Sequence, residues 1–307
     1  MTGAGMIAGG VMGVLVYPGF DPVAIHLGPI NIRWYALAYI TALLLGWRLA
    51  RHLVRRAPVV ATAEQVDDFL TWATLGVVLG GRLGYVLFYQ PALYFAHPAL
   101  IPAVWDGGMS FHGGAIGVGI AIWWFCRRNG LRVLAFADRI AVPVPIGLGL
   151  GRVANFINGE LWGRPVPGCT AAHCWLPVAM IYPAAGPVPR YPSELIEASL
   201  EGIILLAVML LLARRDYWRA RPGWLTGVFV FGYGVCRIVS ECFRQPDPFL
   251  GYLAGGLTMG QILSIPMLLI GAGLIWYALR HPWVAPAMPA DRTEVAAGGG
   301  RVHPGAG

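Results

Sequence analysis

The sequence contains no lysine, and charged side chains of any kind are few. All 22 basic residues are arginine, and charged residues make up 12% of the 307 residues, against 57% that are hydrophobic. A typical soluble domain has about 25% charged residues. Together with a mean hydropathy of +0.63, this composition excludes an ordinary soluble globular chain and predicts a membrane protein.

Cysteine is scarce as well, and five cysteines do not form a disulfide framework. Cys169 and Cys174 share a polar loop with His173, and this spacing leaves a disulfide and a metal site as alternatives. No nucleotide motif and no fuller set of metal ligands is found, so no cofactor is predicted. The net charge of +7 comes without a basic stripe interleaved with aromatic residues, so nucleic acid is not a predicted partner.

Seven apolar stretches approach the roughly 20 residues that a helix needs to cross a bilayer. They are residues 34–50, 69–89, 109–126, 133–152, 194–213, 223–242 and 257–279. These stretches are continuous and do not alternate like the strands of a barrel, so they indicate helices. The predicted fold is all-α, with about seven transmembrane helices and a small periplasmic head region.

The arginines predict the orientation of this bundle. Fourteen of them follow the first, third, fifth and seventh stretches, and four lie in the opposite loops. By the positive-inside rule, the N-terminus lies outside and the C-terminus lies in the cytoplasm; the family resemblance described below implies that the membrane is the inner membrane of a bacterium, so that the N-terminus is periplasmic. We therefore expect an N-terminal arm over residues 1–33, a transmembrane domain over 34–279 that includes a head loop at 153–193, and a disordered tail over 280–307. A signal peptide at residues 6–16 is the alternative for the arm.

Besides Arg48 at the end of the first stretch, four arginines fall within the apolar stretches, where each ionisable group costs about 2.5–3.5 kcal/mol on insertion scales and needs a partner or a function. Arg139 adjoins Asp138 near a helix start, so we expect it to form a local ion pair or to extend its charged end into water. Arg82, Arg152 and Arg237 lie in the predicted outer halves of their helices. They are the first indication of a functional site.

The sixth stretch places Tyr233, Arg237 and Glu241 at i, i+4 and i+8, with Arg244 three residues further on. All four share one stripe of a helix. Arg237 and Glu241 could simply neutralise each other and lock the bundle. The second cation, however, leaves positive charge that a single carboxylate cannot neutralise, and guanidinium groups hold phosphate with paired hydrogen bonds.

Two further segments gather polar groups near the same membrane surface. Arg152 and Asn155 share a helix face at i, i+3, just before Glu160, although a capped helix end could explain the same residues. The apolar run 113–126 is too short to span alone, so the Gly-rich loop before it must begin at membrane depth. His112 then lies at a helix N-terminus that favours an anion, as a catalyst or as a hydrogen-bonded structural residue.

These segments resemble the motifs of prolipoprotein diacylglyceryl transferases. The most specific match is residues 151–164, which read GRVANFINGELWGR, and supporting matches extend the resemblance to about residues 18–280. One departure is Tyr191, which stands where the family usually has a histidine, so we assign it no proton transfer. The loop that carries Cys169 and Cys174 also departs from the family pattern.

The resemblance implies transfer of the diacylglyceryl group of phosphatidylglycerol to the lipobox cysteine of a preprolipoprotein, with release of glycerol phosphate. The implied partners are phosphatidylglycerol, preprolipoprotein signal peptides with a lipobox, and membrane lipids. The implied catalytic residues are His112 as a base for the thiol, and Arg152 and Arg237 as phosphate ligands. The implied substrate-binding residues are Tyr35, Arg82, Asn155, Glu160, Gly163, Tyr233, Glu241 and Arg244.

A lipid flippase or anion transporter is the alternative, because buried arginines and glycine-broken helices also line transport pathways. The two halves of the chain show no convincing internal repeat, which disfavours it. A purely structural subunit is disfavoured because it would not need three outer-half arginines without matching carboxylates.

Overall fold

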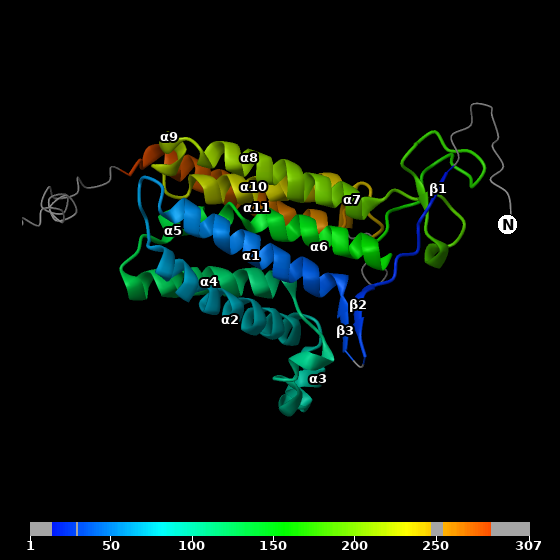
Figure 1. The fold of residues 1–307 in the computed structure, drawn as a ribbon, viewed down its shortest axis with the longest axis horizontal. Coiled ribbons are helices and arrows are strands. Elements are labelled where there is room, and N and C mark those ends of the chain that lie inside the picture. Colours follow the sequence, from blue (N-terminus) through cyan, green and yellow to red (C-terminus); the bar gives the residue numbers. More distant parts are fainter. Residues whose placement is uncertain (1–13, 29, 247–253, 284–307) are drawn as a thin grey trace, which may run out of the picture.

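The computed structural model describes residues 14–28, 30–246 and 254–283. Its long helices run side by side along the longest axis of the molecule (Figure 1). At one end, which we call the Arg-rich end, α1, α4, α8 and α11 finish in the arginine-rich segments. At the other end lie a β-hairpin and the head, residues 159–192.

The described part of the chain forms seven helical rods, and each rod corresponds to one of the predicted apolar stretches. They are α1 (Trp34–Val54), α2 (Ala63–Phe88), α4 (Phe111–Asn129), α5 with α6 (Val133–Ala141 and Val144–Asn158), α7 with the π-helical segment η4 and α8 (Ser193–Glu197, Ala198–Ile204 and Leu205–Ala213), α10 (Trp224–Glu241) and α11 (Met259–Arg280). Four of the rods are long and apolar enough to cross a membrane by length and composition, namely Ala63–Phe88, Val133–Asn158, Ser193–Ala213 and Met259–Arg280. The predicted all-α membrane fold is confirmed.

Local sequence signals explain where two of the rods begin. Thr62 caps α2 by accepting the Gln65 N–H, and Gln65 accepts the Thr62 N–H in return. Thr258 and Gln261 repeat this arrangement at α11. Such capping boxes satisfy backbone donors that a helix start leaves unpaired.

Glycines allow the rods to pack at short distance. A Cβ on Gly80 of α2 would lie 2.8 Å from the Cα of Gly117 of α4, and a Cβ on Gly202 of η4 would lie 2.6 Å from the Cα of Gly149 of α6. Only glycine permits such an approach of two backbones. The second contact sets α6 against the π-helical segment and thereby positions the candidate site.

The head joins α6 to α7 and holds the start of the described chain. Strand β1 (Leu15–Val16) pairs in parallel with β4 (Met180–Ile181), and a disulfide links Cys169 to Cys174. Tyr17 stacks on Tyr182 at 5.4 Å and donates to the Ile157 carbonyl at 2.6 Å. Burial, and then the Glu194 carboxylate, raise the pKa of Tyr182. The arm that was predicted over residues 1–33 is therefore tied to the end of α6 in its described part, whereas residues 1–13 lie outside the description.

Short elements that the all-α prediction did not contain complete the loops. Strands β2 (Val23–Leu27) and β3 (Ile30–Arg33) form an antiparallel hairpin before α1. The remaining short helices are α3 (Pro91–Ala96), η1 (Pro98–Leu100), η2 (Val104–Asp106), η3 (Pro183–Ala185), α9 (Asp216–Arg219) and η5 (Ala254–Gly256). Within the predicted tail, the backbone N–H of Trp283 donates to the Ala220 carbonyl at 2.7 Å. The tail from residue 284 onward lies outside the described residues.

The expectation for Arg139 is wrong. Its side chain is fully buried, with 0% exposure, and its Nη2 donates to the Pro58 carbonyl at 3.2 Å. The Asp138 carboxylate accepts instead from the first turn of α10, from the Gly223 N–H at 2.9 Å and from the Thr226 N–H and hydroxyl at 2.8 and 2.7 Å. Asp138 therefore caps α10. Both charged side chains of α5 are buried in the bundle and do not reach solvent.

Candidate active site

A network of buried ion pairs joins α6, α7, η4 and α10. The Arg152 Nε lies 2.8 Å from Glu197 Oε2, and the Arg237 Nη1 lies 3.1 Å from the same oxygen. Arg237 Nη2 also meets Glu241 Oε1 at 2.5 Å, and Arg244 Nη1 lies 3.5 Å from that oxygen. One carboxylate therefore holds the two arginines that were predicted as catalytic.

A third glutamate lies slightly further away. Glu201 Oε2 is 3.7 Å from Arg152 Nε, and Glu201 Oε1 is 3.9 Å from Arg237 Nη1. The side chains of Glu197 and Glu201 are 1% and 0% exposed. Carboxylates this deeply buried are stable as anions only beside cations or hydrogen-bond donors, which the two arginines supply.

The expected surplus of positive charge is therefore wrong. Arg152, Arg237 and Arg244 form ion pairs with three carboxylates, not with Glu241 alone. The argument that the outer arginines lack carboxylates fails for Arg152 and Arg237 for the same reason, whereas the partners of Arg82 within the described residues are backbone carbonyls and a tyrosine ring. The signal was present in the sequence, because Glu197 and Glu201 are four residues apart in a largely apolar helical segment and such residues are neighbours on a helix surface.

The helix that carries both glutamates is irregular at this point. Residues 198–204 form the π-helical segment η4, which contains Glu201 and directly follows Glu197. Such widened turns are frequently found at functional sites. Here the segment lies against α6 through Gly149 and Gly202, so its acidic face meets Arg152.

A second polar cluster lies at the end of α6 and the start of α1. The Tyr35 hydroxyl donates to Glu160 Oε1, and Asn155 Nδ2 donates to the same oxygen at 2.9 Å and to the Tyr35 hydroxyl. Gly159 ends α6 with a φ of +64°, which turns Glu160 back so that its N–H reaches the Asn155 carbonyl at 3.1 Å. The structure thus brings together three of the predicted substrate-binding residues.

Arg152 has donors that the protein does not use. Its ion pairs are both made through Nε, and within the described residues neither Nη nitrogen has a protein partner. Its side chain is 20% exposed, more than that of Arg237 at 12%. Arg237, in contrast, directs both Nη nitrogens at carboxylates.

Tyr233 and His112 lie around the ion network. Tyr233 is buried at 6% exposure, and it is coupled electrostatically to Glu201, Arg237 and Arg152. His112 belongs to the first turn of α4, where Ser110 caps the helix by accepting the Gly113 N–H at 3.2 Å. His112 also lies within electrostatic range of Arg237.

Arg82 has other partners. Its guanidinium donates to the carbonyls of Ile101, Gly107, Gly108 and Leu100 at 2.5 to 3.2 Å, and it stacks over Tyr94 at 5.0 Å. All three nitrogens are engaged, and the residue is 4% exposed. Arg82 therefore fastens the loop between α2 and α4, and its contact with a lipid head group stays a prediction.

Gly163 and Arg244 lie where the head meets the end of α10. Gly163 and Arg244 form a β-bridge, and the Gly163 N–H donates to the Tyr191 carbonyl at 3.0 Å. Arg164 donates from Nε to the Arg244 carbonyl and from Nη2 to the Glu241 carbonyl, both at 2.7 Å. Tyr191 packs on Phe243 at 5.3 Å. Gly163, Arg164 and Tyr191 of the head therefore hold the end of α10, which carries Glu241, from outside the network.

Comparison with known proteins gives consistent matches over most of the chain. The family model described as prolipoprotein diacylglyceryl transferase matches residues 22–277. The chain is 63% identical to a phosphatidylglycerol-prolipoprotein diacylglyceryl transferase of Gluconacetobacter diazotrophicus over 281 residues, covering 91% of this chain and 98% of the relative. It is 64% identical to the protein of the same name from Acidiphilium cryptum over 266 residues, covering 86% and 94%.

Proposed function

The chain belongs to the prolipoprotein diacylglyceryl transferase family, and we propose that its reaction takes place at the ion network between α6, α7 and α10. Family membership confirms the resemblance carried by residues 151–164. The chain is accordingly a membrane enzyme that transfers the diacylglyceryl group of phosphatidylglycerol to a prolipoprotein. The geometry of the network supports different roles in this transfer for Arg152, for Arg237 and for the glutamates.

In the proposed reaction the acceptor is the thiol of the lipobox cysteine. Its sulfur attacks the glyceryl carbon that carries the phosphodiester, a carbon–sulfur bond forms, and the carbon–oxygen bond to phosphate breaks. Glycerol phosphate leaves with the bonding electron pair, and the thiol proton passes to a base. Because a free thiol has a pKa near 8.5 and is mostly protonated at neutral pH, a base or a cationic environment accelerates the attack.

The observation that carries the proposal is the state of Arg152. Its Nε is fixed on Glu197, while both Nη nitrogens have no protein partner within the described residues. A guanidinium held in this way presents two parallel donors to a phosphate without reorganising during the reaction. We assign Arg152 to the phosphate that becomes the leaving group.

Arg237 and the glutamates have a different proposed part. Arg237 is held between Glu197 and Glu241, so it contributes fixed positive charge next to Arg152. Since the carboxylates balance the arginines, phosphate binding would depend on directed donors more than on net charge. Tyr35, Asn155, Glu160 and Tyr233 would then orient the lipid head group beside Arg152.

His112 remains the proposed base. It lies at the start of α4 and close enough to Arg237 to interact with it electrostatically, so a thiol that approached the ion network would come near the imidazole. The uncharged imidazole is the form that can accept a proton.

The experiment that tests the proposed function follows the product. Purified protein is incubated with phosphatidylglycerol and a lipobox peptide, and mass spectrometry measures the thioether-linked lipid and glycerol phosphate. The matched control is the same peptide with its cysteine replaced by serine, which should give neither product. Release of glycerol phosphate without a thioether would contradict the transfer. Passage of lipid across a vesicle membrane without formation of product would instead support the transporter. No feature of the site favours the transporter over the transferase.

The proposed orientation places the head in the periplasm of the bacterial inner membrane and the Arg-rich end in the cytoplasm. Single-cysteine variants test it with a thiol reagent that cannot cross membranes. With the other four cysteines replaced by serine, including the exposed Cys242, Cys169 should be labelled in intact cells. A cysteine in place of Arg128 should be labelled only after lysis. The opposite result would reverse the orientation.

A further inference from the structure

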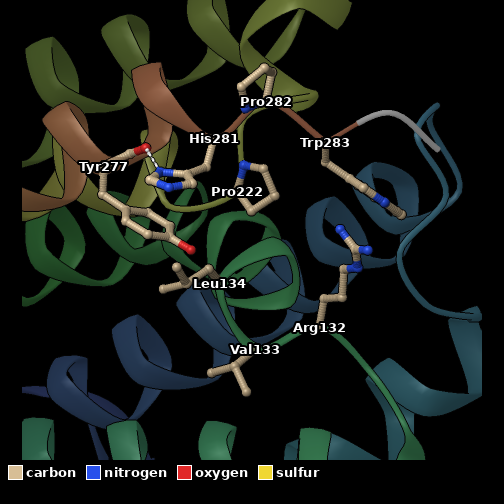
Figure 2. Close-up of a pocket in the computed structure, with 8 residues that line it drawn as sticks. All are labelled: Arg132, Val133, Leu134, Pro222, Tyr277, His281, Pro282 and Trp283. Carbon is tan, nitrogen blue, oxygen red and sulfur yellow. Dashed lines mark hydrogen bonds between the residues drawn. The ribbon is translucent and has the colours of Figure 1, made fainter.

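A pocket of about 600 Å³ lies at the Arg-rich end, opposite the candidate active site. It is lined by Arg132, Val133, Leu134, Pro222, Tyr277, His281, Pro282 and Trp283. Figure 2 shows the Arg132 guanidinium beside the Trp283 ring on one side, and the rings of Tyr277 and His281 on the other. None of the eight lining residues is acidic.

The polar groups of this pocket are available to a ligand. The Arg132 guanidinium stacks on the Trp283 ring at 4.8 Å, and within the described chain none of its N–H groups donates a hydrogen bond. Arg132 is also the N-cap residue of α5, but its side chain does not bond to the helix. The backbone N–H groups of Val133 and Leu134 have no acceptor in the described residues. A cation next to unsatisfied helix N–H groups favours an anion.

His281 adds a further polar group. Its Nδ1 bonds to the Tyr277 carbonyl at 2.9 Å, and its ring stacks on the Tyr277 ring at 4.3 Å. These contacts hold the imidazole ring in place through Nδ1, and Nε2 makes no hydrogen bond within the described residues. Trp283 contributes an indole Nε1 that is buried without a hydrogen-bond partner among the residues the structure describes.

The pocket lies at one end of the helical bundle, where a membrane surface is expected. Rod α5–α6 begins at Val133, α10 begins at Trp224 just after Pro222, and α11 ends at Arg280. Three helical rods thus begin or end around it, and aromatic and arginine residues are typical of a membrane interface. Phospholipid phosphates are found at this level, and apolar lining by Val133, Leu134 and the two prolines suits the glycerol and upper acyl chain.

We propose that this pocket binds the phosphate head group of an anionic phospholipid, at the membrane surface away from the candidate active site. Arg132 is the ligand of the phosphate, the first N–H groups of α5 share its charge, and His281 and Tyr277 close the other side. The site is separate from the reaction, so it goes beyond the proposed function. Inorganic phosphate has the same chemistry, and the test has to separate the two sources.

The test compares lipid binding by the wild type, Arg132→Gln and Arg280→Gln. Arg280 is the matched control, because its guanidinium stacks over Trp276 at 5.4 Å in the same region but does not line the pocket. The full-length protein is placed in phosphatidylcholine nanodiscs with increasing phosphatidic acid, and the thermal midpoint and the lipids retained in native mass spectrometry are recorded. Phosphatidic acid would also have access to the candidate active site, so the informative quantity is the difference between variants.

We expect Arg132→Gln to retain one phosphatidic acid fewer and to need about tenfold more lipid for the same thermal shift, which corresponds to one lost charge-assisted hydrogen bond. Arg280→Gln should behave as wild type. Thioether formation by Arg132→Gln should be unchanged, which shows that the variant is folded. Equal lipid retention by all three proteins would overturn the proposal. An Arg132-dependent shift produced by inorganic phosphate in pure phosphatidylcholine, at matched ionic strength, would also overturn it in favour of a free anion.

Discussion

The Glu197 carboxylate lies 2.8 Å from the Nε of Arg152 and contacts it from a helix far along the chain. The same oxygen lies 3.1 Å from Arg237. One buried carboxylate therefore sets the relative position of the two arginines. It binds Arg152 only through Nε, so the Nη nitrogens of Arg152 do not contact Glu197. Preorganised donors of this kind stabilise charge that develops in a transition state.

Glu197→Gln should impair the enzyme much more than Glu201→Gln. Both side chains are almost fully buried, but Glu197 makes the close contacts, whereas neither oxygen of Glu201 has a hydrogen-bond partner within the described residues. Removing one partner of a buried pair costs about 3–5 kcal/mol. We expect Glu197→Gln to lower the melting temperature and to slow thioether formation by roughly a hundredfold, a factor equivalent to ~2.7 kcal/mol.

The matched change at Glu201 should slow the reaction less than about tenfold, since only a longer-range attraction is lost. Rates and melting temperatures are measured on membrane-inserted protein at equal levels, with KM for phosphatidylglycerol determined separately from kcat. If the two glutamines have equal effects, the bridging role of Glu197 is wrong.

Arg152→Lys should abolish most activity while the protein still folds. Lysine keeps the charge beside Glu197 but lacks the planar pair of donors. Loss of one charge-assisted contact made mainly in the transition state costs on the order of 3 kcal/mol, or roughly a hundredfold in rate. Arg237→Lys should also lower activity sharply, and it should in addition lower the melting temperature, because Arg237 joins two carboxylates.

The control for this comparison is Arg127→Lys, because Arg127 is exposed in the last turn of α4. Its substitution should change activity less than about threefold, as surface charges contribute at most ~1 kcal/mol. Arg139 is unsuitable as a surface control despite its predicted position, because its complete burial makes Arg139→Lys a change in stability. Near-normal thioether formation by the Arg152 and Arg237 variants would show that both arginines are structural.

Hydropathy and spacing along the chain are sufficient to predict the seven rods and the polar residues of α6 and α10. These signals are local, because a membrane helix satisfies its own backbone and an i, i+4 stripe lies within one segment. Glu160, Asn155 and Tyr35 are placed together only by the family resemblance, since 120 residues separate Tyr35 from Asn155.

The features that the sequence does not predict depend on partners distant along the chain. Glu197 falls within an apolar stretch, and the two arginines that it contacts lie on other helices. The short strand β1 has its partner at Met180 and Ile181, so no alternation near residue 15 could reveal it. The burial of Arg139 is not predicted because the sequence does not show that the loop around Pro58, far along the chain, contacts α5.

Replacing Cys169 and Cys174 together by serine should leave catalysis nearly intact. The disulfide closes a small loop in the head, away from the ion pairs of the network, and the reacting thiol belongs to the substrate. A loop of this size predicts a stabilisation of about 2 kcal/mol or less. We expect a modestly lower melting temperature and thioether formation within about twofold of wild type. A folded double variant without activity would instead require an enzyme thiol in the mechanism.

Gly163→Ala should disturb the candidate site without changing any polar side chain. An added Cβ would lie 2.7 Å from the Phe243 carbonyl oxygen and even closer to that of Tyr191. The head and the end of α10 would have to separate. That shift would move Glu241, whose carbonyl is held by the Arg164 Nη2 at 2.7 Å.

Overpacking of this kind costs about 1–3 kcal/mol, so we expect a lower melting temperature and a reduced kcat. Gly119→Ala is the control, because no atom lies within 4 Å of a Cβ at this helical glycine, and alanine favours a helix by up to ~1 kcal/mol. Thioether formation and thermal unfolding are compared for both variants in the same nanodiscs. If Gly163→Ala matches Gly119→Ala in both measurements, the close contact between the head and α10 does not support Glu241, and the predicted contact of Gly163 with substrate has to be tested on its own.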